Sequence, residues 1–173
     1  MVVHDNRAEP VETLTIGIIT SVSTMYSGGG GQAEDVTLYR VPDKADGTPP
    51  LVELLSLPLN TALMIRACFS EQDYENRRGV CHDDYDYKAS ITFAPRQDKM
   101  ALARLIYRAT TITMPRSSRR SKDNSSGRKL TAREIKPRTD RRCTYQRTIV
   151  FNPTTKQYEF DRPGPDCSEY TVP

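Results

Sequence analysis

The sequence contains no tryptophan, only two histidines and four cysteines, and no long run of apolar residues. No apolar stretch approaches the roughly 20 residues that a membrane-spanning helix requires. Histidine is so scarce that a hydrolase of the Ser-His-Asp type would have to use His4 or His82, and no G-x-S-x-G motif is present. Because most recognisable catalytic signatures are missing, we expect a protein that is not an enzyme and has no catalytic residues.

The 173 residues are enough for one domain with a sizeable core and are short for two. Hydrophobic residues make up 36% and charged residues 27% of the chain, and the mean hydropathy is −0.63. The apolar residues occur in short runs along most of the chain, which favours a globular domain with polar loops. We therefore expect a flexible N-terminal segment at 1–12 and a single β-rich domain at 13–173.

Several β-rich runs predict a mainly β fold. The apolar, β-branched run Leu14–Thr20 predicts a buried strand, and the four glycines at 28–31 predict a flexible link to the next strand. The apolar segment 51–69 predicts two strands with a break at Pro58-Leu59-Asn60. Apolar residues occupy every second position of Asp84–Phe93, which indicates a half-buried strand with one wet face.

The segment after Asp98 is compatible with two kinds of structure. Its apolar residues from Leu102 to Ala109 have helical spacing, and Asp98 is placed to cap a helix there. The residues that follow, ATTITM, read as a strand. Together these short strands, with at most one or two short helices, predict a single antiparallel β-sandwich or barrel-like domain.

The four cysteines predict two structural disulfides. No two of them are closer than thirteen positions, whereas structural zinc sites use close pairs of cysteines, so we expect no metal site. Cross-strand partners in a hairpin have position numbers with a constant sum. One candidate pair is centred on residue 155, in a turn-like segment, and the other is centred between residues 74 and 75, in a polar turn region. Of the three connectivities, we predict the pairs Cys68–Cys81 and Cys143–Cys167.

Two structural disulfides imply an oxidising compartment, which is the periplasm, the cell surface or the outside of the cell. The alternative is a cytosolic protein with four free thiols, because cysteine is often a small core residue. The N-terminal residues, MVVHDNRAEPVETL, contain no apolar region typical of a signal peptide. We predict an extracytoplasmic protein, periplasmic or secreted, whose signal peptide is missing from this sequence.

Positive charge is concentrated in one segment. Between Arg116 and Arg142 there are eleven Lys and Arg residues and three acidic residues, which gives a formal local charge of +8 and leaves −5 for the remainder. Residues 117–129 contain no apolar side chain, which predicts a protruding basic loop at about 115–130. A solvated loop with no partner is the alternative. The residues that we expect to bind a partner are Arg119, Arg120, Lys122, Arg128 and Lys129.

The segment Cys81–Asp84 brings together a cysteine, a histidine and two acidic residues. His82 and its acidic neighbours have the chemistry to bind a divalent cation or to act as an acid–base pair. Strand alternation, however, directs Asp84 and Asp86 to one face and Asp83 to the other, and no glycine follows to form a calcium loop. We expect a polar strand entrance whose carboxylates face water, with no metal or other cofactor.

These features lead to three functional hypotheses. The first is a non-enzymatic, extracytoplasmic binding protein, of the inhibitor or immunity type, whose basic loop engages a protein partner with an acidic surface or cleft. The second is a module that binds an anionic polymer, either nucleic acid or polysaccharide. The third and least favoured is a hydrolase that uses His82 with nearby carboxylates.

Overall fold

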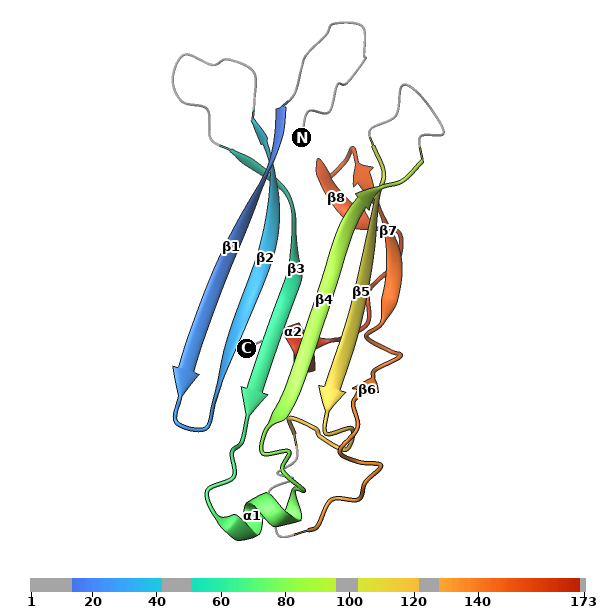
Figure 1. Cartoon of the computed structure of the whole chain (residues 1–173). Coiled ribbons are helices and arrows are strands. Elements are labelled where there is room, and N and C mark those ends of the chain that lie inside the picture. The colour runs from blue at the N-terminus through green and yellow to red at the C-terminus, as the bar shows by residue number, and fades with distance from the viewer. Residues whose placement is uncertain (1–13, 42–50, 96–102, 122–127, 172–173) are drawn as a thin grey trace, which may run out of the picture.

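The computed structural model describes residues 14–41, 51–95, 103–121 and 128–171, so the predicted flexible segment at 1–12 lies outside the described residues. Within them the chain forms one antiparallel sheet of eight strands and two short helices (Figure 1). The elements are β1 (Leu14–Tyr26), β2 (Gly29–Val41), β3 (Val52–Ile65), α1 (Glu71–Asn76), β4 (Asp83–Phe93), β5 (Leu105–Met114), β6 (Arg138–Thr139), β7 (Tyr145–Asn152), β8 (Gln157–Phe160) and α2 (Ser168–Thr171). The prediction of a mainly β, antiparallel domain with one or two short helices is confirmed, and the described strands do not close into a barrel.

The sheet follows the chain order almost throughout. Its strands run β1-β2-β3-β4-β5-β7-β8, and the short β6 pairs with β5 beside this path. β8 contacts β3, although β4, β5 and β7 lie between them in the strand order. The sheet must therefore curve strongly. The short C-terminal helix α2 packs against β3 and β4 (Figure 1). Its Tyr170 belongs to the same hydrophobic core as Leu63 of β3 and Tyr85 of β4.

Tyrosine supplies the bulk of the core in this chain without tryptophan. Tyr85, Tyr87, Tyr107 and Tyr170 are each at most 1% exposed. Three of the four hydroxyls have buried partners: those of Tyr87 and Tyr107 are 2.5 Å apart, Tyr107 donates to the carbonyl oxygen of Pro58 at 2.7 Å, and that of Tyr170 lies 2.9 Å from the Thr113 hydroxyl. Burial raises the pKa of Tyr87 and of Tyr107, so both hydroxyls remain protonated and available as donors.

β1 lies at the edge of the sheet, so the prediction of a buried strand at Leu14–Thr20 is wrong. Thr15 is the buried residue of β1, while Ile18 and Ile19 are 39% and 62% exposed. β-Branched residues favour a strand wherever it lies in the sheet, and an edge strand has a neighbour on one side only. The apolar composition therefore identifies the strand but not its position.

β3 continues through Pro58, so the predicted break at this residue is also wrong. Pro58 pairs with Asp35, directly after a register shift between Glu34 and Asp35 in β2. A proline has no N–H to give to the ladder, and it is tolerated where the ladder is already interrupted.

β5 begins at Leu105, which corrects the helical interpretation of the residues after Asp98; residues 96–102 lie outside the described part of the chain. Burial in β5 alternates strictly, from Leu105 through Tyr107 and Ala109. The packing of every second residue into the core outweighs the helix propensity of this segment. The same alternation in β4 confirms the prediction for Asp84–Phe93.

The glycines at 28–31 belong mostly to the sheet and are not the flexible link that was predicted. Tyr26 pairs with Gly29, so a two-residue turn joins β1 to β2. A Cβ on Gly29 would lie 2.1 Å from the carbonyl oxygen of Met64, which is too close for any side chain. Glycine is needed there because the backbone of β3 passes so near.

Candidate functional site

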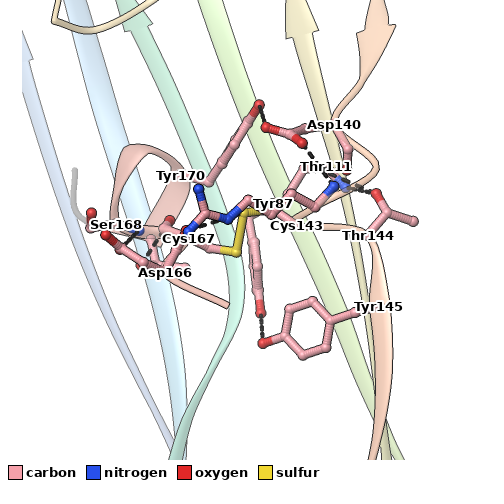
Figure 2. Close-up of a disulfide and its surroundings, with 12 residues drawn as sticks. Tyr87, Thr111, Asp140, Cys143, Thr144, Tyr145, Asp166, Cys167, Ser168 and Tyr170 are labelled. Carbon is pink, nitrogen blue, oxygen red and sulfur yellow. Dashed lines mark hydrogen bonds between the residues drawn. A yellow bond between two sulfur atoms is a disulfide. The ribbon is translucent and has the colours of Figure 1, made fainter. Parts of the chain in front are cut away.

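The disulfide Cys143–Cys167 confirms one predicted pair and holds the end of the basic segment against the sheet (Figure 2). It joins the residues before β7 to the start of α2, with a Cα–Cα distance of 5.7 Å. Beside it, Thr111 of β5 donates to the carbonyl oxygen of Asp140 at 3.2 Å, and the Tyr170 hydroxyl donates to the Asp140 carboxylate at 3.2 Å. The chain at 140–143 is therefore tied to β5 and to α2.

The disulfide Cys68–Cys81 confirms the second predicted pair and closes the connection between β3 and β4. Ile65 pairs with Asp83, so the two cysteines lie just beyond the last cross-strand pair, as the hairpin argument requires. The polar turn expected between them contains the helix α1, which Ser70 caps by accepting a hydrogen bond from the Asp73 N–H at 3.0 Å.

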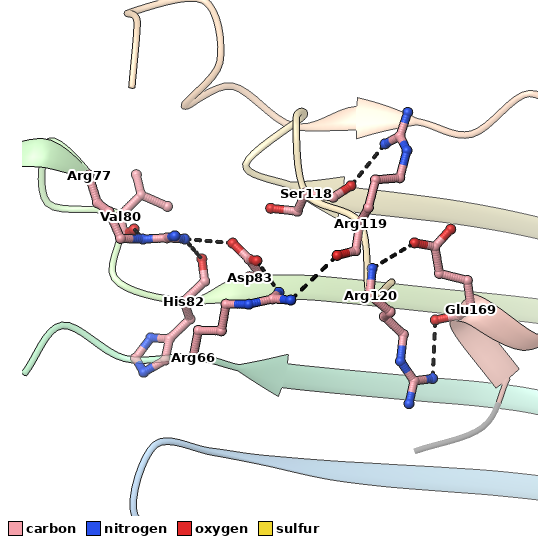
Figure 3. A network of polar contacts seen from close by, with 9 residues as sticks. All are labelled: Arg66, Arg77, Val80, His82, Asp83, Ser118, Arg119, Arg120 and Glu169. Atoms are coloured by element: carbon pink, nitrogen blue, oxygen red, sulfur yellow. Dashed lines mark hydrogen bonds and ion pairs between the residues drawn. The ribbon is translucent and has the colours of Figure 1, made fainter. Parts of the chain in front are cut away.

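Asp83 is the centre of a buried polar network at this end of the sheet (Figure 3). Its side chain is fully buried and forms ion pairs with Arg66 and, at 2.5 Å, with Arg77. Arg77, itself 4% exposed, also donates to the carbonyl oxygens of Val80 and His82 at 2.8 and 3.2 Å. The Asp83 carboxylate, at the start of β4, therefore binds one arginine before α1 and one after it, and so holds both ends of this connection against the sheet.

The first part of the basic segment is attached to this network. Arg66 donates to the carbonyl oxygen of Arg119 at 3.5 Å, and the backbone N–H of Arg120 donates to the Glu169 carboxylate at 2.9 Å. The Arg120 guanidinium donates to the carbonyl oxygen of Glu169 at 3.4 Å (Figure 3). It also donates to the carbonyl oxygen of Ser168 at 3.4 Å. Residues 119–120 therefore lie against α2, where they border a shallow hollow of about 490 Å³.

The second part of the basic segment is folded around Glu134. Its carboxylate accepts from the backbone N–H and the hydroxyl of Thr131, which in turn accepts from the Glu134 N–H, as in a capping box. Arg128 forms a two-point ion pair with the same carboxylate. The Arg128 hydrogen bond, followed by those from Thr131, lowers the pKa of Glu134 to about 2. This carboxyl group stays ionised over the whole physiological range of pH.

The same part is anchored to the body of the protein at two further points. Leu130 is 4% exposed, and its N–H donates to the carbonyl oxygen of Asn76, at the end of α1, at 2.7 Å. The N–H of Arg116 donates to the carbonyl oxygens of Glu134 and Lys136 at 2.9 and 3.1 Å. Residues 128–143 are therefore a folded part of the domain. Apart from Arg128, which is exposed but paired with Glu134, their exposed cations are Lys129, Arg133, Lys136, Arg141 and Arg142, which we call the basic surface.

The structure distributes the five predicted binding residues among different environments. Arg119 and Arg120 are half-buried against the body, Arg128 is paired with Glu134, and Lys129 is exposed within the basic surface. Lys122 lies outside the described residues. The other four members of the basic surface belong to the charged segment but were not predicted as binding residues. Charge alone does not show which cations form ion pairs within the molecule and which remain exposed.

The acidic helix α1 borders the basic surface. It carries Glu71, Asp73 and Glu75, and it is joined to the basic segment by the hydrogen bond from Leu130 to Asn76. The acidic residues of α1 and the first cations of the basic surface therefore lie at the same end of the domain.

The acidic residues around His82 diverge, as strand alternation predicted. Asp83 is fully buried and points inward to its two arginines, so the expectation that these carboxylates face water is wrong for Asp83, because two guanidinium groups replace water as its partners. Asp84 and Asp86 line a hollow on the opposite face of the sheet. Burial raises the pKa of Asp84, against the opposing effect of His82. Among the described residues, no group of three or more His, Cys, Asp or Glu side chains is placed to hold a metal ion.

Comparison with protein-family models, with curated proteins and with solved structures finds no match to this chain. None of the helices in the described part of the chain is long and apolar enough to cross a membrane. A functional conclusion has to come from the geometry of the chain itself.

Proposed function

We propose that this chain is a non-enzymatic binding protein of an extracytoplasmic compartment, and that it engages an acidic protein through the basic surface. The observation that carries the proposal is the fixed backbone beneath the five exposed cations. Glu134, the buried Leu130 and the Cys143–Cys167 disulfide hold this backbone in place. The two disulfides are compatible with an oxidising compartment.

A fixed backbone matters because binding is weakened by the entropy lost when a mobile loop becomes ordered. The backbone from Leu130 to Cys143 already has partners in the free protein, so this cost is reduced. Exposed cations on such a frame attract an acidic partner over long distances and speed its association.

The acidic border favours a protein partner over a long polyanion. A nucleic acid or polysaccharide chain that follows the basic surface toward α1 would meet Glu71, Asp73 and Glu75. A folded partner can place acidic side chains over the cations and basic ones over α1, which gives orientation as well as attraction. An inhibitor or immunity-type protein that covers the acidic cleft of an extracytoplasmic enzyme is the form of the proposal that best fits this mixed pattern.

Site-specific photo-crosslinking tests the proposal. A photoreactive residue is placed at Ala132, which is exposed between the cations, and a matched control carries it at Ser90, exposed on β4. Both variants, with disulfides intact, are illuminated in the extracytoplasmic fraction of the source cells. We expect a crosslink to an acidic protein from position 132 and none from position 90.

Two outcomes would contradict the proposal. Equal crosslinking from the two positions would show that the basic surface is not the contact. Loss of all protein crosslinks, together with salt-sensitive binding of heparin and DNA, would favour the anionic-polymer function instead.

A further inference from the structure

β1 is a long, uncharged edge strand with no described neighbour on its outer side. Its thirteen residues, LTIGIITSVSTMY, include no Asp, Glu, Lys, Arg or Pro, and among the described strands it pairs with β2 alone (Figure 1). Proteins usually protect such edges with charges, prolines, bulges or short strands, because the free N–H and C=O groups can pair with another chain. The pairing of β1 with β2 shows no register shift, and β1 carries none of these protections.

The apolar side chains of β1 are exposed along its length. Ile19 and Val22 are 62% and 61% exposed, Met25 is 87% exposed and Tyr26 is 54% exposed. The other edge of the sheet differs, because β8 has only four residues and includes Glu159. These side chains lie on both faces of the strand, so apolar surface flanks the free backbone edge on either side, as at a site of interaction with another chain.

We propose that β1 pairs with β1 of a second copy of this chain, in antiparallel orientation, and so joins two sheets across a twofold axis. Charge favours this occupant. β1 contains no charged residue, so pairing with its own copy places no like charges opposite each other in any register. A strand with charged residues near the twofold axis would place them opposite, or close to, the same residues of the second copy. β2, of similar length, contains Glu34, Asp35 and Arg40 and would bring such charges into the interface.

The extent of β1 is adequate for a dimer. Thirteen residues at about 3.4 Å each give an edge of about 44 Å, along which about half of the residues direct their N–H and C=O groups outward. Pairing of two such edges buries the outward backbone groups and the adjoining parts of the exposed apolar side chains, and main-chain hydrogen bonds along the edge supply the affinity. A twofold interface uses the same surface on both copies, so the assembly closes at two.

Charge introduced into the edge tests this pairing. The double variant Ile19→Lys with Val22→Lys places like charges near the axis in each copy, and both positions are exposed, so the fold should be retained. The control is Thr92→Lys with Gln157→Lys, which adds the same charge at exposed positions of β4 and β8. Sedimentation equilibrium on the full, oxidised chain, from about 1 µM to about 1 mM, measures the monomer–dimer constant.

We expect a concentration-dependent dimer for the wild type and the control, and at least about a hundredfold weaker dimerisation for the β1 variant with an unchanged circular dichroism spectrum. Hydrogen exchange gives a second measure that needs no variant: the amides of β1 should gain protection as wild-type concentration rises. A monomeric wild type at every concentration would overturn the proposal, and so would a β1 variant that dimerises as tightly as the control. A wild type that stays monomeric but binds an added β1 peptide would assign the edge to another partner.

Discussion

Replacement of Asp83 by asparagine is expected to cost more stability than any other single isosteric change of a charged residue in the described part of the chain. Asp83 is fully buried, and its two oxygens bind the guanidinium groups of Arg66 and Arg77. The side chain of Arg77 is only 5% exposed, so it cannot turn to water when its partner is neutralised. Asparagine keeps the volume but removes the negative charge and replaces one acceptor with a donor.

The size of the effect follows from the two contacts. Hydrogen bonds to charged groups contribute about 1.5–3 kcal/mol each, and a buried ion pair broken from one side typically costs about 3–5 kcal/mol, because the other charge remains buried. We therefore expect Asp83→Asn to lower the free energy of unfolding by about 3–5 kcal/mol. This is a large part of the roughly 5–15 kcal/mol that stabilises a typical domain.

Equilibrium unfolding in urea with the disulfides intact measures this change. The chain has no tryptophan, so tyrosine fluorescence and near-ultraviolet circular dichroism serve as probes. The midpoint should fall by more than about 1 M urea. The matched control, Asp86→Asn, lies on the same strand but faces the opposite side, and should change stability by less than about 0.5 kcal/mol. A loss below about 1 kcal/mol for Asp83→Asn, or an equal loss in the control, would refute the reasoning.

Two further predictions concern the frame of the basic surface. Replacing both Cys143 and Cys167 with alanine opens a loop with a sequence separation of 24 and should lower the free energy of unfolding by about 3 kcal/mol. The same urea unfolding measures this change, and an unchanged midpoint would contradict the prediction. The pKa of Glu134 is lowered from 4.5 to about 2, so its ionised form stabilises the fold above pH 4.5 and this contribution disappears as pH falls toward 2. The stability difference between wild type and Glu134→Gln should therefore shrink over this interval, whereas a difference independent of pH would contradict the assignment.

Two kinds of feature could be predicted from the sequence: those set by the alternation of residues along a strand, and the disulfide pairs, whose cysteines lie at equal distances from a predicted turn. The disulfide pairs followed from hairpin arithmetic: Ile149 pairs with Phe160 in β7 and β8, so Cys143 and Cys167 lie near the open end of that hairpin. The divergence of Asp83 from Asp84 and Asp86 followed from the period of a strand, but the burial of Asp83 against two arginines did not.

Features that depend on contacts between distant segments could not be read from the sequence. The edge position of β1 is set by the order of strands in the sheet, and the continuity of β3 through Pro58 depends on a bulge at Leu59, which has no partner in β2. In the basic segment, Arg128 and Arg133 are alike in sequence. Only the fold shows that Arg128 is paired with Glu134 while Arg133 is exposed.

The association rate of the crosslinked acidic partner, measured at increasing salt, tests the central claim most directly. The surface variant is Lys129→Glu, Arg133→Glu and Lys136→Glu, and the control changes the same charge at the exposed residues Arg104, Lys156 and Arg162. We predict slow, salt-insensitive association for the surface variant, while the control matches the wild type, whose rate falls as salt rises. Equal slowing in the two variants would contradict the account, because net charge and not the basic surface would then control binding.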